Sequence, residues 1–236
     1  MVQFQFLTNS ASRAIEPPII QHYAAASRIP ERVAWRDAAY TVLDVETTGL
    51  NTKRDAILSI GLVEIEQGRI LLERTWYALV QPPPHLTVPA DSIRIHRLFR
   101  GDVAAAPTLD EILPELLERL MGRVLVVHFA QIDVDFLNRA LHQLWRAKLR
   151  GPALDTMRIA QALYHQERWL TGHDGMQSVT NLRELAERAN LPIHNEHNAL
   201  SDAITTAQLF LAQATRLERR GEGLLLHLLN RGRCLR

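Results

Sequence analysis

The pattern of apolar and polar positions divides most of this 236-residue chain into alternating strand and helix signals. Strands are expected where apolar or β-branched runs are bounded by turn residues, near 40–46, 57–66, 70–80, 123–128 and 153–155. Helices are expected where apolar residues recur every three or four positions, near 109–121, 132–149, 156–164, 181–189 and 199–217. Gln67-Gly68 predicts a tight hairpin between the second and third strands. The order predicts an α/β domain with a mixed five-stranded sheet flanked by helices.

The two ends of the chain depart from this order. Residues 9–27 have an alanine-rich helical composition that Pro17-Pro18 should break or restart. We therefore expect residues 1–38 to form a helical N-terminal extension to a domain at 39–217. Residues 218–236 are expected to be a basic C-terminal tail, because arginines outnumber glutamates there. For this tail a solvated helix is favoured over a nucleic-acid contact.

The first expected strand ends on two carboxylates, in the sequence Asp44-Val45-Glu46-Thr47-Thr48-Gly49. Because successive strand side chains alternate between faces, Asp44 and Glu46 point the same way and can bind one hard cation together. Gly49 gives backbone freedom for a turn beside a ligand, and the two threonines offer hydroxyl groups to something polar. Taken alone, this segment is equally consistent with a solvated strand edge.

The helix expected after the fourth strand carries two aspartates that are not equivalent. Asp133 shares a helix face with Phe136 and Leu137, whereas Asp135 lies on the opposite, polar face. Asp133 therefore faces the interior and Asp135 faces water. Of the two, Asp133 is the candidate metal ligand.

A histidine and an aspartate stand at the start of the last long helix. His197 precedes Asp202 by five residues. If both were helical, their side chains would diverge by roughly 140°. They can converge on one site only if His197 lies in the loop before the helix. Asn198 and Ser201 are both candidate N-caps for that helix.

Three acidic motifs in this order resemble those of the DEDDh, or DnaQ-like, 3′→5′ exonucleases. The matching segments are Asp44-x-Glu46-Thr47-Thr48-Gly49, His128-x-Ala130-x-x-Asp133-x-x-Phe136-Leu137 and His197-x-Ala199-Leu200-x-Asp202. They cover about residues 39–216, and three ordered motifs are far more specific than one. The resemblance implies a ribonuclease-H-like fold. It also implies similarity to the proofreading, epsilon-type subunits of bacterial DNA polymerase III.

The resemblance further implies roles for the matched residues. Asp44, Glu46 and Asp202 would hold one Mg²⁺ or Mn²⁺, and Asp44 would help hold a second ion that Asp133 supports. Two such ions about 3.5–4 Å apart stabilise the attacking and leaving oxygens of a phosphodiester displacement. His197 would be the general base, since imidazole has an unperturbed pKa of about 6.5. Substrate contacts are expected from Thr47, Thr48, Gly49, His96 and Ile132.

The chain departs from the family pattern at three positions near these motifs. Phe129 stands where asparagine is common, and Ile132 where phenylalanine is common. Neither is a metal ligand, so the changes affect contacts with the terminal nucleotide; Ile132 has an apolar surface but no ring for base stacking. Arg97 replaces a glycine after the motif histidine, and its charge could meet either a phosphate or solvent.

Composition and charge narrow the class of protein. The chain is 47% hydrophobic, enough for one sizeable core, and it has no apolar run near 18 residues, so we expect no membrane span. Net charge is +1, which argues against strong non-specific duplex binding. The N-terminus lacks a secretory pattern, and the single cysteine, Cys234, excludes an intramolecular disulfide. A cytoplasmic location is therefore expected.

Three other features have simpler interpretations than the functional ones they suggest. Asp155 comes directly before a helix, so an N-cap is favoured over a metal ligand. A zinc site at His194, Glu196 and His197 would lack cysteines and a clear fourth ligand. Gln3-Phe4-Gln5-Phe6-Leu7 has a loose similarity to peptides that bind sliding clamps, but short apolar N-termini are common.

The leading hypothesis is a metal-dependent 3′→5′ exonuclease that releases mononucleotides from single-stranded or frayed DNA. A proofreading-type role beside a DNA polymerase or sliding clamp would fit it. One alternative with the same fold is an RNA-trimming exoribonuclease of the ribonuclease T or oligoribonuclease type. Another is a non-catalytic nucleic-acid- or polymerase-binding module, against which the five intact motif residues weigh. DNA and RNA are not distinguished by these motifs, because discrimination of the 2′-hydroxyl depends on pocket shape.

Overall fold

Five strands form one mixed sheet at the centre of the molecule. The structure, a computed structural model, describes residues 17–86, 88–171, 181–194 and 197–235, with the backbone alone over 166–171. Its strands are β1 (Tyr40–Thr47), β2 (Ile57–Glu66), β3 (Arg69–Leu79), β4 (Val124–Val127) and β5 (Ala153–Asp155). They lie in the order β3-β2-β1-β4-β5. Strands β1 and β2, and β2 and β3, are antiparallel, whereas β4 is parallel to both β1 and β5. The predicted mixed five-stranded α/β fold is confirmed.

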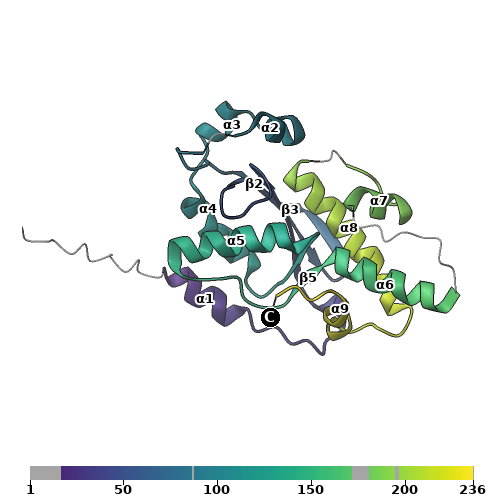
Figure 1. Ribbon diagram of the computed structural model, residues 1–236. Helices are drawn as coiled ribbons and strands as arrows, with labels where there is room; N and C mark the ends of the chain where they lie inside the picture. The colour runs from purple at the N-terminus through teal and green to yellow at the C-terminus, as the bar shows by residue number, and fades with distance from the viewer. Residues whose placement is uncertain (1–16, 87, 172–180, 195–196, 236) are drawn as a thin grey trace, which may run out of the picture.

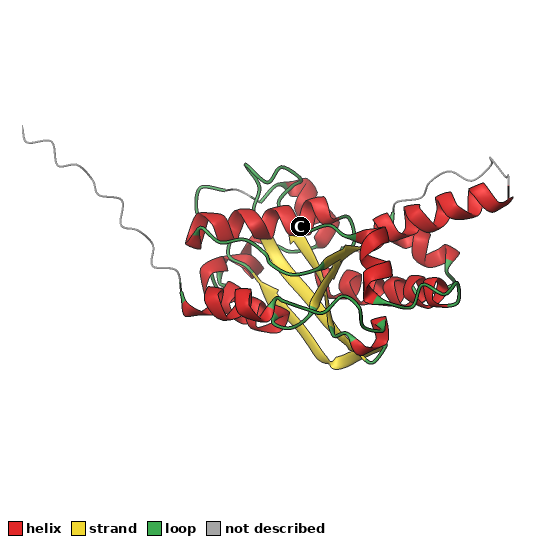
Figure 2. Ribbon diagram, turned by 90° about the horizontal axis from the view of Figure 1, so that it is seen from below, coloured by secondary structure: helices red, strands yellow, loops and turns green. Residues whose placement is uncertain are grey.

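Helices precede, connect and follow these strands. They are α1 (Pro18–Ala26), α2 (Ala90–His96), α3 (Arg100–Ala104), α4 (Leu109–Leu120), α5 (Ala130–Trp145), α6 (Thr156–Thr171), α7 (Leu182–Arg188), α8 (Ala199–Glu218) and α9 (Leu225–Gly232). Helices α4 and α5 lie on one side of the sheet, and α6, α8 and α9 on the other (Figure 1; Figure 2). Among the described helices, none is both long and apolar enough to cross a membrane.

Strand β1 shows how the alternation of side chains builds two cores. Leu43 and Val45 are buried with residues of α4 and α5. Tyr40 and Val42 are buried on the opposite face with Phe210 of α8. Polar residues at the end of β1 continue the same alternation, so Asp44 and Glu46 emerge on the face that α8 covers.

The described residues of the two terminal segments contact each other and the central domain. The main-chain N–H of Leu225 donates to Val33, and that of Cys234 donates to Ala153 on β5. Leu225, Leu228 and Leu229 of α9 are fully buried in the core under α8. The segment 218–236, expected as a solvated basic tail, thus contains an amphipathic helix with a buried face. Two of its arginines pair with glutamates: Arg231 with Glu222 at 2.9 Å and Arg233 with Glu31 at 2.8 Å.

Three helix boundaries differ from those expected from the sequence. Helix α6 continues to Thr171 rather than ending near 164. Helix α5 begins at Ala130, two residues early, because the buried carboxylate of Asp155 accepts the N–H groups of Phe129 and Ala130 at 3.1 Å each. It ends at Trp145 because Arg146 takes a left-handed conformation with φ 55°. Asp155 is distant in sequence, so local pattern could not place this cap.

Candidate active site

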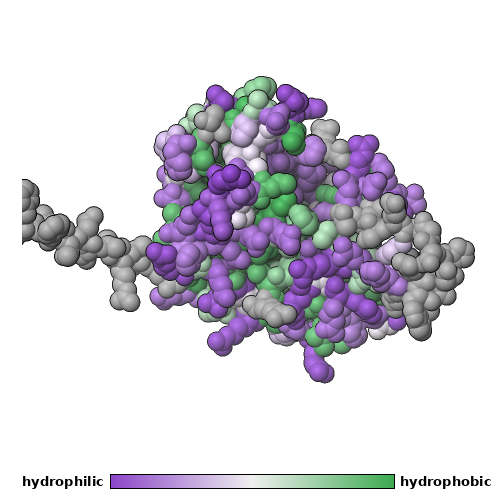
Figure 3. Space-filling view, in the orientation of Figure 1, coloured by the Kyte–Doolittle hydropathy of each residue, from purple (hydrophilic) through white to green (hydrophobic). Residues whose placement is uncertain are grey.

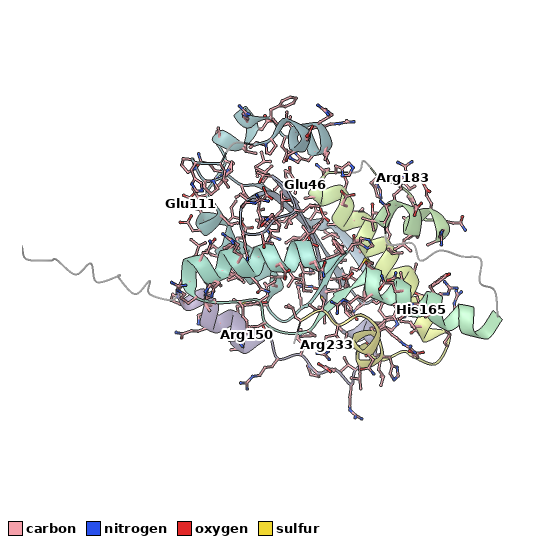
Figure 4. All side chains as sticks on the ribbon, in the orientation of Figure 1. Glu46, Glu111, Arg150, His165, Arg183 and Arg233 are labelled. Carbon is pink, nitrogen blue, oxygen red and sulfur yellow. The ribbon has the colours of Figure 1, made fainter. Side chains whose placement is uncertain are left out.

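Three carboxylates meet where β1 ends and α8 begins. Asp44 and Glu46 come from β1, and Asp202 from the first turn of α8. One oxygen atom of each carboxylate lies within 4.8 Å of the others, close enough for a single cation to contact all three. Glu46 lies at the end of the sheet beside the start of α8 (Figure 4). The structure therefore joins the first and third sequence motifs in one acidic cluster.

Charge in this cluster is strongly disfavoured without a counterion. Burial, followed by the nearby Asp133, Asp202 and Glu46 carboxylates, raises the pKa of Asp44 well above its usual range. Burial, and then Asp202, raises the pKa of Glu46 to about 8. Oxygen ligands of this kind are those that hard divalent cations prefer. The donor set therefore fits a divalent cation, which would offset the repulsion that the pKa values report.

Asp133 lies beside the acidic cluster and supports its frame. It comes from the first turn of α5, is 2% exposed, and accepts the main-chain N–H of Val45 at 3.0 Å. Val45 stands between Asp44 and Glu46, so this bond fixes the part of β1 that carries both carboxylates. Burial raises the pKa of Asp133 well above its usual range. Among the described residues, Asp133 is outside the group of three whose oxygens converge.

His197 lies in the loop directly before α8, and its backbone reaches the acidic cluster. Its main-chain N–H donates to Oδ2 of Asp202 at 2.9 Å, and its φ of 60° is left-handed. Asn198, rather than Ser201, is the N-cap: its Oδ1 accepts the N–H of Ser201 at 3.1 Å. The exposed His197 side chain is therefore placed by a capped helix start and by the bond from its own N–H to the Asp202 carboxylate.

The turn after β1 uses its polar groups internally. The Thr48 hydroxyl donates to Asp55 at 3.1 Å and accepts the N–H of Ala56 at 3.0 Å, and the Thr47 hydroxyl donates to the carbonyl of Gly49 at 2.7 Å. A Cβ on Gly49 would lie 2.6 Å from a carboxylate oxygen of Asp55. Asp55, which belongs to none of the three motifs, organises this turn. The predicted substrate contacts Thr47, Thr48 and Gly49 form the turn with it.

His96 belongs to a hydrogen-bonded chain that ties α2 to the end of β1. Its Nδ1 accepts the N–H of Leu98 at 3.1 Å, so its Nε2 carries the hydrogen and donates to Ser92 Oγ at 2.5 Å. Ser92 in turn donates to the carbonyl of Thr47 at 3.1 Å. Burial, and then His197, lowers the pKa of His96. His96 is thus a neutral, buried residue of α2 that positions Ser92, and Ser92 bonds α2 to the end of β1.

The second motif contains His128 and the two residues that depart from the family pattern, Phe129 and Ile132. His128 Nδ1 is 2.8 Å from the Thr156 hydroxyl, joining the ends of β4 and β5. Ile132 is partly buried against the core beneath α5. Phe129 is the N-cap residue of α5, with φ 65° and 37% of its surface exposed. A phenylalanine at positive φ is unusual, since asparagine is the residue that tolerates this conformation best after glycine.

Comparison with known proteins matches this arrangement of motifs. The model of an exonuclease family, RNase_T, matches residues 41–210, which include all three acidic motifs. The chain belongs to this exonuclease family. The family predicted from the sequence is therefore confirmed, and with it an enzyme of the exonuclease class.

Relatives and solved structures agree with this assignment. The chain is 30% identical over 173 residues to DNA polymerase III PolC-type from Clostridium perfringens, covering 73% of this chain and 11% of that protein. It is 27% identical over 175 residues to DNA polymerase III subunit epsilon from Aquifex aeolicus, covering 74% and 80%. The fold resembles the nuclease domain of 3′hExo, a DEDDh family member, with a TM-score of 0.64, 16% identity and coverage of 81% and 97%. The chain thus spans about a ninth of its PolC-type relative.

Proposed function

We propose that this protein is a metal-dependent 3′→5′ exonuclease that releases mononucleotides from single-stranded or frayed DNA. The observation that carries the proposal is the convergence of Asp44, Glu46 and Asp202, three half-buried residues whose carboxylate oxygens lie within 4.8 Å of one another. Three carboxylates at this separation destabilise the folded protein when they are charged, unless they bind a cation. A hydrolytic site for phosphodiesters explains why the chain keeps them together.

These carboxylates would hold two Mg²⁺ or Mn²⁺ ions, with Asp133 supporting the second. Bound ions would supply stabilisation of the negative charge that develops on the scissile phosphate. Asp44 and Glu46 present their oxygens from a strand anchored by the bond between Asp133 and Val45, so the metal-binding geometry is held by backbone rather than by flexible side chains. Asp202 approaches from the opposite element, α8.

His197 is the general base of the proposed reaction. Its imidazole takes the proton from the attacking water, and the left-handed loop that carries it is fixed by the bond from its N–H to Asp202. The side chain is exposed, so it can reach solvent and substrate, while its backbone keeps it beside the ligands. A neutral imidazole is needed for this role, because only an unprotonated ring nitrogen can accept a proton.

Exposed apolar side chains beside the site support a single-stranded substrate. Leu50 follows the turn after β1 and is 77% exposed, and Phe129 at the start of α5 is 37% exposed. Hydrophobic surface interrupts the hydrophilic surface on the face seen in Figure 3. Unpaired bases stack on such side chains with little dependence on sequence, whereas paired bases are not accessible. The departure at Phe129 thus adds a ring for stacking near the active site.

DNA is the proposed substrate because the two relatives are a DNA polymerase and a DNA polymerase subunit. The same names support a proofreading setting, in which the chain acts beside a polymerase; the proposed sliding-clamp contact at Gln3–Leu7 lies outside the described residues. RNA is the second candidate, since the DEDDh nuclease domain that shares the fold is described as bound to rAMP. The proposed domain organisation is an N-terminal extension at 1–38, a nuclease domain at 39–217 and a basic C-terminal segment at 218–236.

One experiment tests the reaction, its direction and its substrate. Matched DNA and RNA oligonucleotides, each with the same sequence, are digested with Mg²⁺ and then with a chelator. Stepwise release of 3′-terminal mononucleotides from DNA, abolished by chelator and by a bulky 3′-blocking group, is expected. Comparable cleavage of a closed circular single strand would show an endonuclease instead. Preferential digestion of RNA would select the second candidate, and substrate binding without turnover would select a non-catalytic module.

A further inference from the structure

Gly61 lies at the point where the sheet and α8 come into contact beside the acidic cluster. In the register of the sheet it stands opposite Asp44 on β1 and opposite Tyr77 on β3. A Cβ built on Gly61 would lie 2.2 Å from the N atom of Leu200, and 2.3 Å and 2.5 Å from the carbonyl carbon and oxygen of Ala199. The peptide that joins the first two residues of α8 thus rests directly on this glycine.

We propose that Gly61 is a positioning residue of the active site, which sets how closely Asp202 approaches Asp44 and Glu46. The proposal rests on the metal-dependent exonuclease function proposed above. Asp202 is one turn along α8 from the peptide that Gly61 accommodates, and its N–H donates to the carbonyl of the N-cap Asn198 at 2.9 Å. The position of that peptide therefore determines where the Asp202 carboxylate lies.

The packing of the rest of α8 explains why the close approach is local. Ala199, Ala203 and Ala207 recur every four residues along the helix and are fully buried, whereas the large Phe210 is buried further along. These small side chains let the first half of α8 lie near the sheet. At the end of α8 that bears Asp202, the absence of a side chain on Gly61 allows the closest approach. Both partners at this contact are main chain, so no side-chain rotation could relieve an added methyl group.

A methyl group at residue 61 must therefore move one of two backbone segments. Non-bonded carbon atoms are optimally about 3.5–4.0 Å apart, so contacts of 2.2–2.5 Å require a shift of roughly 1 Å. Strand β2 is bonded on both sides, to β1 and β3, and cannot easily yield. The start of α8 follows a loop that has no regular structure at its described residues 191–194 and 197–198. The helix end, with Asp202, is the part that moves.

Such a shift has a consequence that distinguishes between cations. Mg²⁺ requires near-octahedral oxygen ligands at about 2.0–2.1 Å, whereas Ca²⁺ accepts ligands at about 2.3–2.6 Å in flexible geometry. Moving Asp202 away by roughly 1 Å should therefore weaken Mg²⁺ binding more than Ca²⁺ binding. A general loss of folding would lower the affinity for both ions together. A change in the ratio of the Mg²⁺ and Ca²⁺ affinities therefore indicates a displaced Asp202 carboxylate rather than a loss of folding stability.

The test compares Gly61→Ala with wild type in the full chain. Metal-free protein is titrated with Mg²⁺ alone and with Ca²⁺ alone, following heat of binding and melting temperature. We expect the Mg²⁺ affinity of Gly61→Ala to fall by about 10- to 100-fold, the size typical when a residue that orients a metal ligand is changed, and the Ca²⁺ affinity to fall by a smaller factor. Gly101→Ala is the matched control, because a Cβ there meets nothing within 4 Å.

The outcomes separate this inference from the proposed function. Wild-type protein that binds no Mg²⁺ and digests no 3′ end would refute the proposed function. Active wild type together with a folded Gly61→Ala of unchanged Mg²⁺ affinity, or with equal losses for both ions, would overturn the inference alone. If Gly61→Ala does not fold, Ala203→Val tests the same displacement through the next turn of α8. A folded Ala203→Val with wild-type preference between Mg²⁺ and Ca²⁺ would also overturn it.

Discussion

Replacing Asp44 by asparagine should stabilise the metal-free protein while removing its response to Mg²⁺. Asparagine has nearly the shape of aspartate, so packing changes little and the main effect is the loss of one negative charge. Asp44 is the member of the acidic cluster whose pKa is raised by all three of its neighbours, Asp133, Asp202 and Glu46, in addition to burial. Removing the charge of Asp44 therefore relieves more electrostatic repulsion than removing the charge of a carboxylate with fewer acidic neighbours.

The size of this effect follows from the separation of the carboxylates. Two unit charges 4.8 Å apart repel by about 3.5 kcal/mol at an effective dielectric constant of about 20. Partial protonation lowers the sum, because Glu46 has a pKa of about 8 and is mostly neutral at pH 7. We therefore expect Asp44→Asn to raise the free energy of unfolding of metal-free protein by about 1–3 kcal/mol above pH 8, where Glu46 is mostly charged.

The pH dependence has a definite sign. Because the folded-state pKa of Glu46 is raised from 4.5 to about 8, the folded protein binds more protons than the unfolded chain between these values. Metal-free wild type should therefore lose stability as pH rises through this window, and Asp44→Asn should lose less. Saturating Mg²⁺ reverses the order, since a cation at 100 times its Kd adds about 2.7 kcal/mol to wild type alone.

Urea unfolding followed by tryptophan fluorescence measures the free energy of unfolding of each protein under four conditions. These are chelator and Mg²⁺, each at pH 6 and at pH 8.5. Asp135→Asn is the control, because Asp135 is exposed on the same helix as Asp133 and should change neither stability nor the Mg²⁺ response. If Asp44→Asn destabilised the protein in chelator at pH 8.5, or gained as much from Mg²⁺ as wild type does, the electrostatic account of this site would be wrong.

Three further substitutions test other parts of the site. His197→Ala should lower kcat by about 10²- to 10⁴-fold with little change in Mg²⁺ affinity; a near-wild-type rate would leave His197 without a role as base. Phe129→Asn should raise stability by about 1 kcal/mol, since asparagine accepts the left-handed conformation. It should also raise KM for single strands, through loss of a stacking ring; a stability gain with unchanged KM would remove Phe129 from the substrate surface. Asp155→Ala should lower the free energy of unfolding by about 1.5–3 kcal/mol, because three N–H groups lose their acceptor, while Mg²⁺ affinity stays the same; an equally large loss of Mg²⁺ affinity would make it a ligand.

The local sequence pattern was sufficient to place a site residue where its position depends on residues close to it in the chain. The two-residue period of a strand places Asp44 and Glu46 on one face, and the structure shows them converging there. The 3.6-residue period of a helix separates buried Asp133 from exposed Asp135. The five-residue offset between His197 and Asp202 requires a loop before the helix, and Asn198 provides its cap. Each conclusion depends only on backbone geometry within a few residues.

Features that depend on distant segments were outside the reach of that pattern. The sequence identifies Asp155 as a cap for its own helix, but not that the same carboxylate also begins α5, because 25 residues separate it from Ala130. Leucines in an arginine-rich segment suggested a solvated helix, yet burial against α8 makes α9 part of the core. Likewise His96 matched a substrate contact by motif, and only the fold shows it bonded to Ser92, whose hydroxyl donates to Thr47 at the end of β1.

Gly61 shows most clearly what the tertiary structure alone decides. In the sequence it is a glycine within an apolar strand, where glycine weakens the strand. The sequence does not show which segment approaches this glycine. Its meaning depends on which helix crosses that strand, and α8 begins 138 residues later at Ala199. The chain determines which residues are ligands through local alternation of side chains, whereas the distance between them is set by how closely two backbones pack, and packing of separate segments has no local signature.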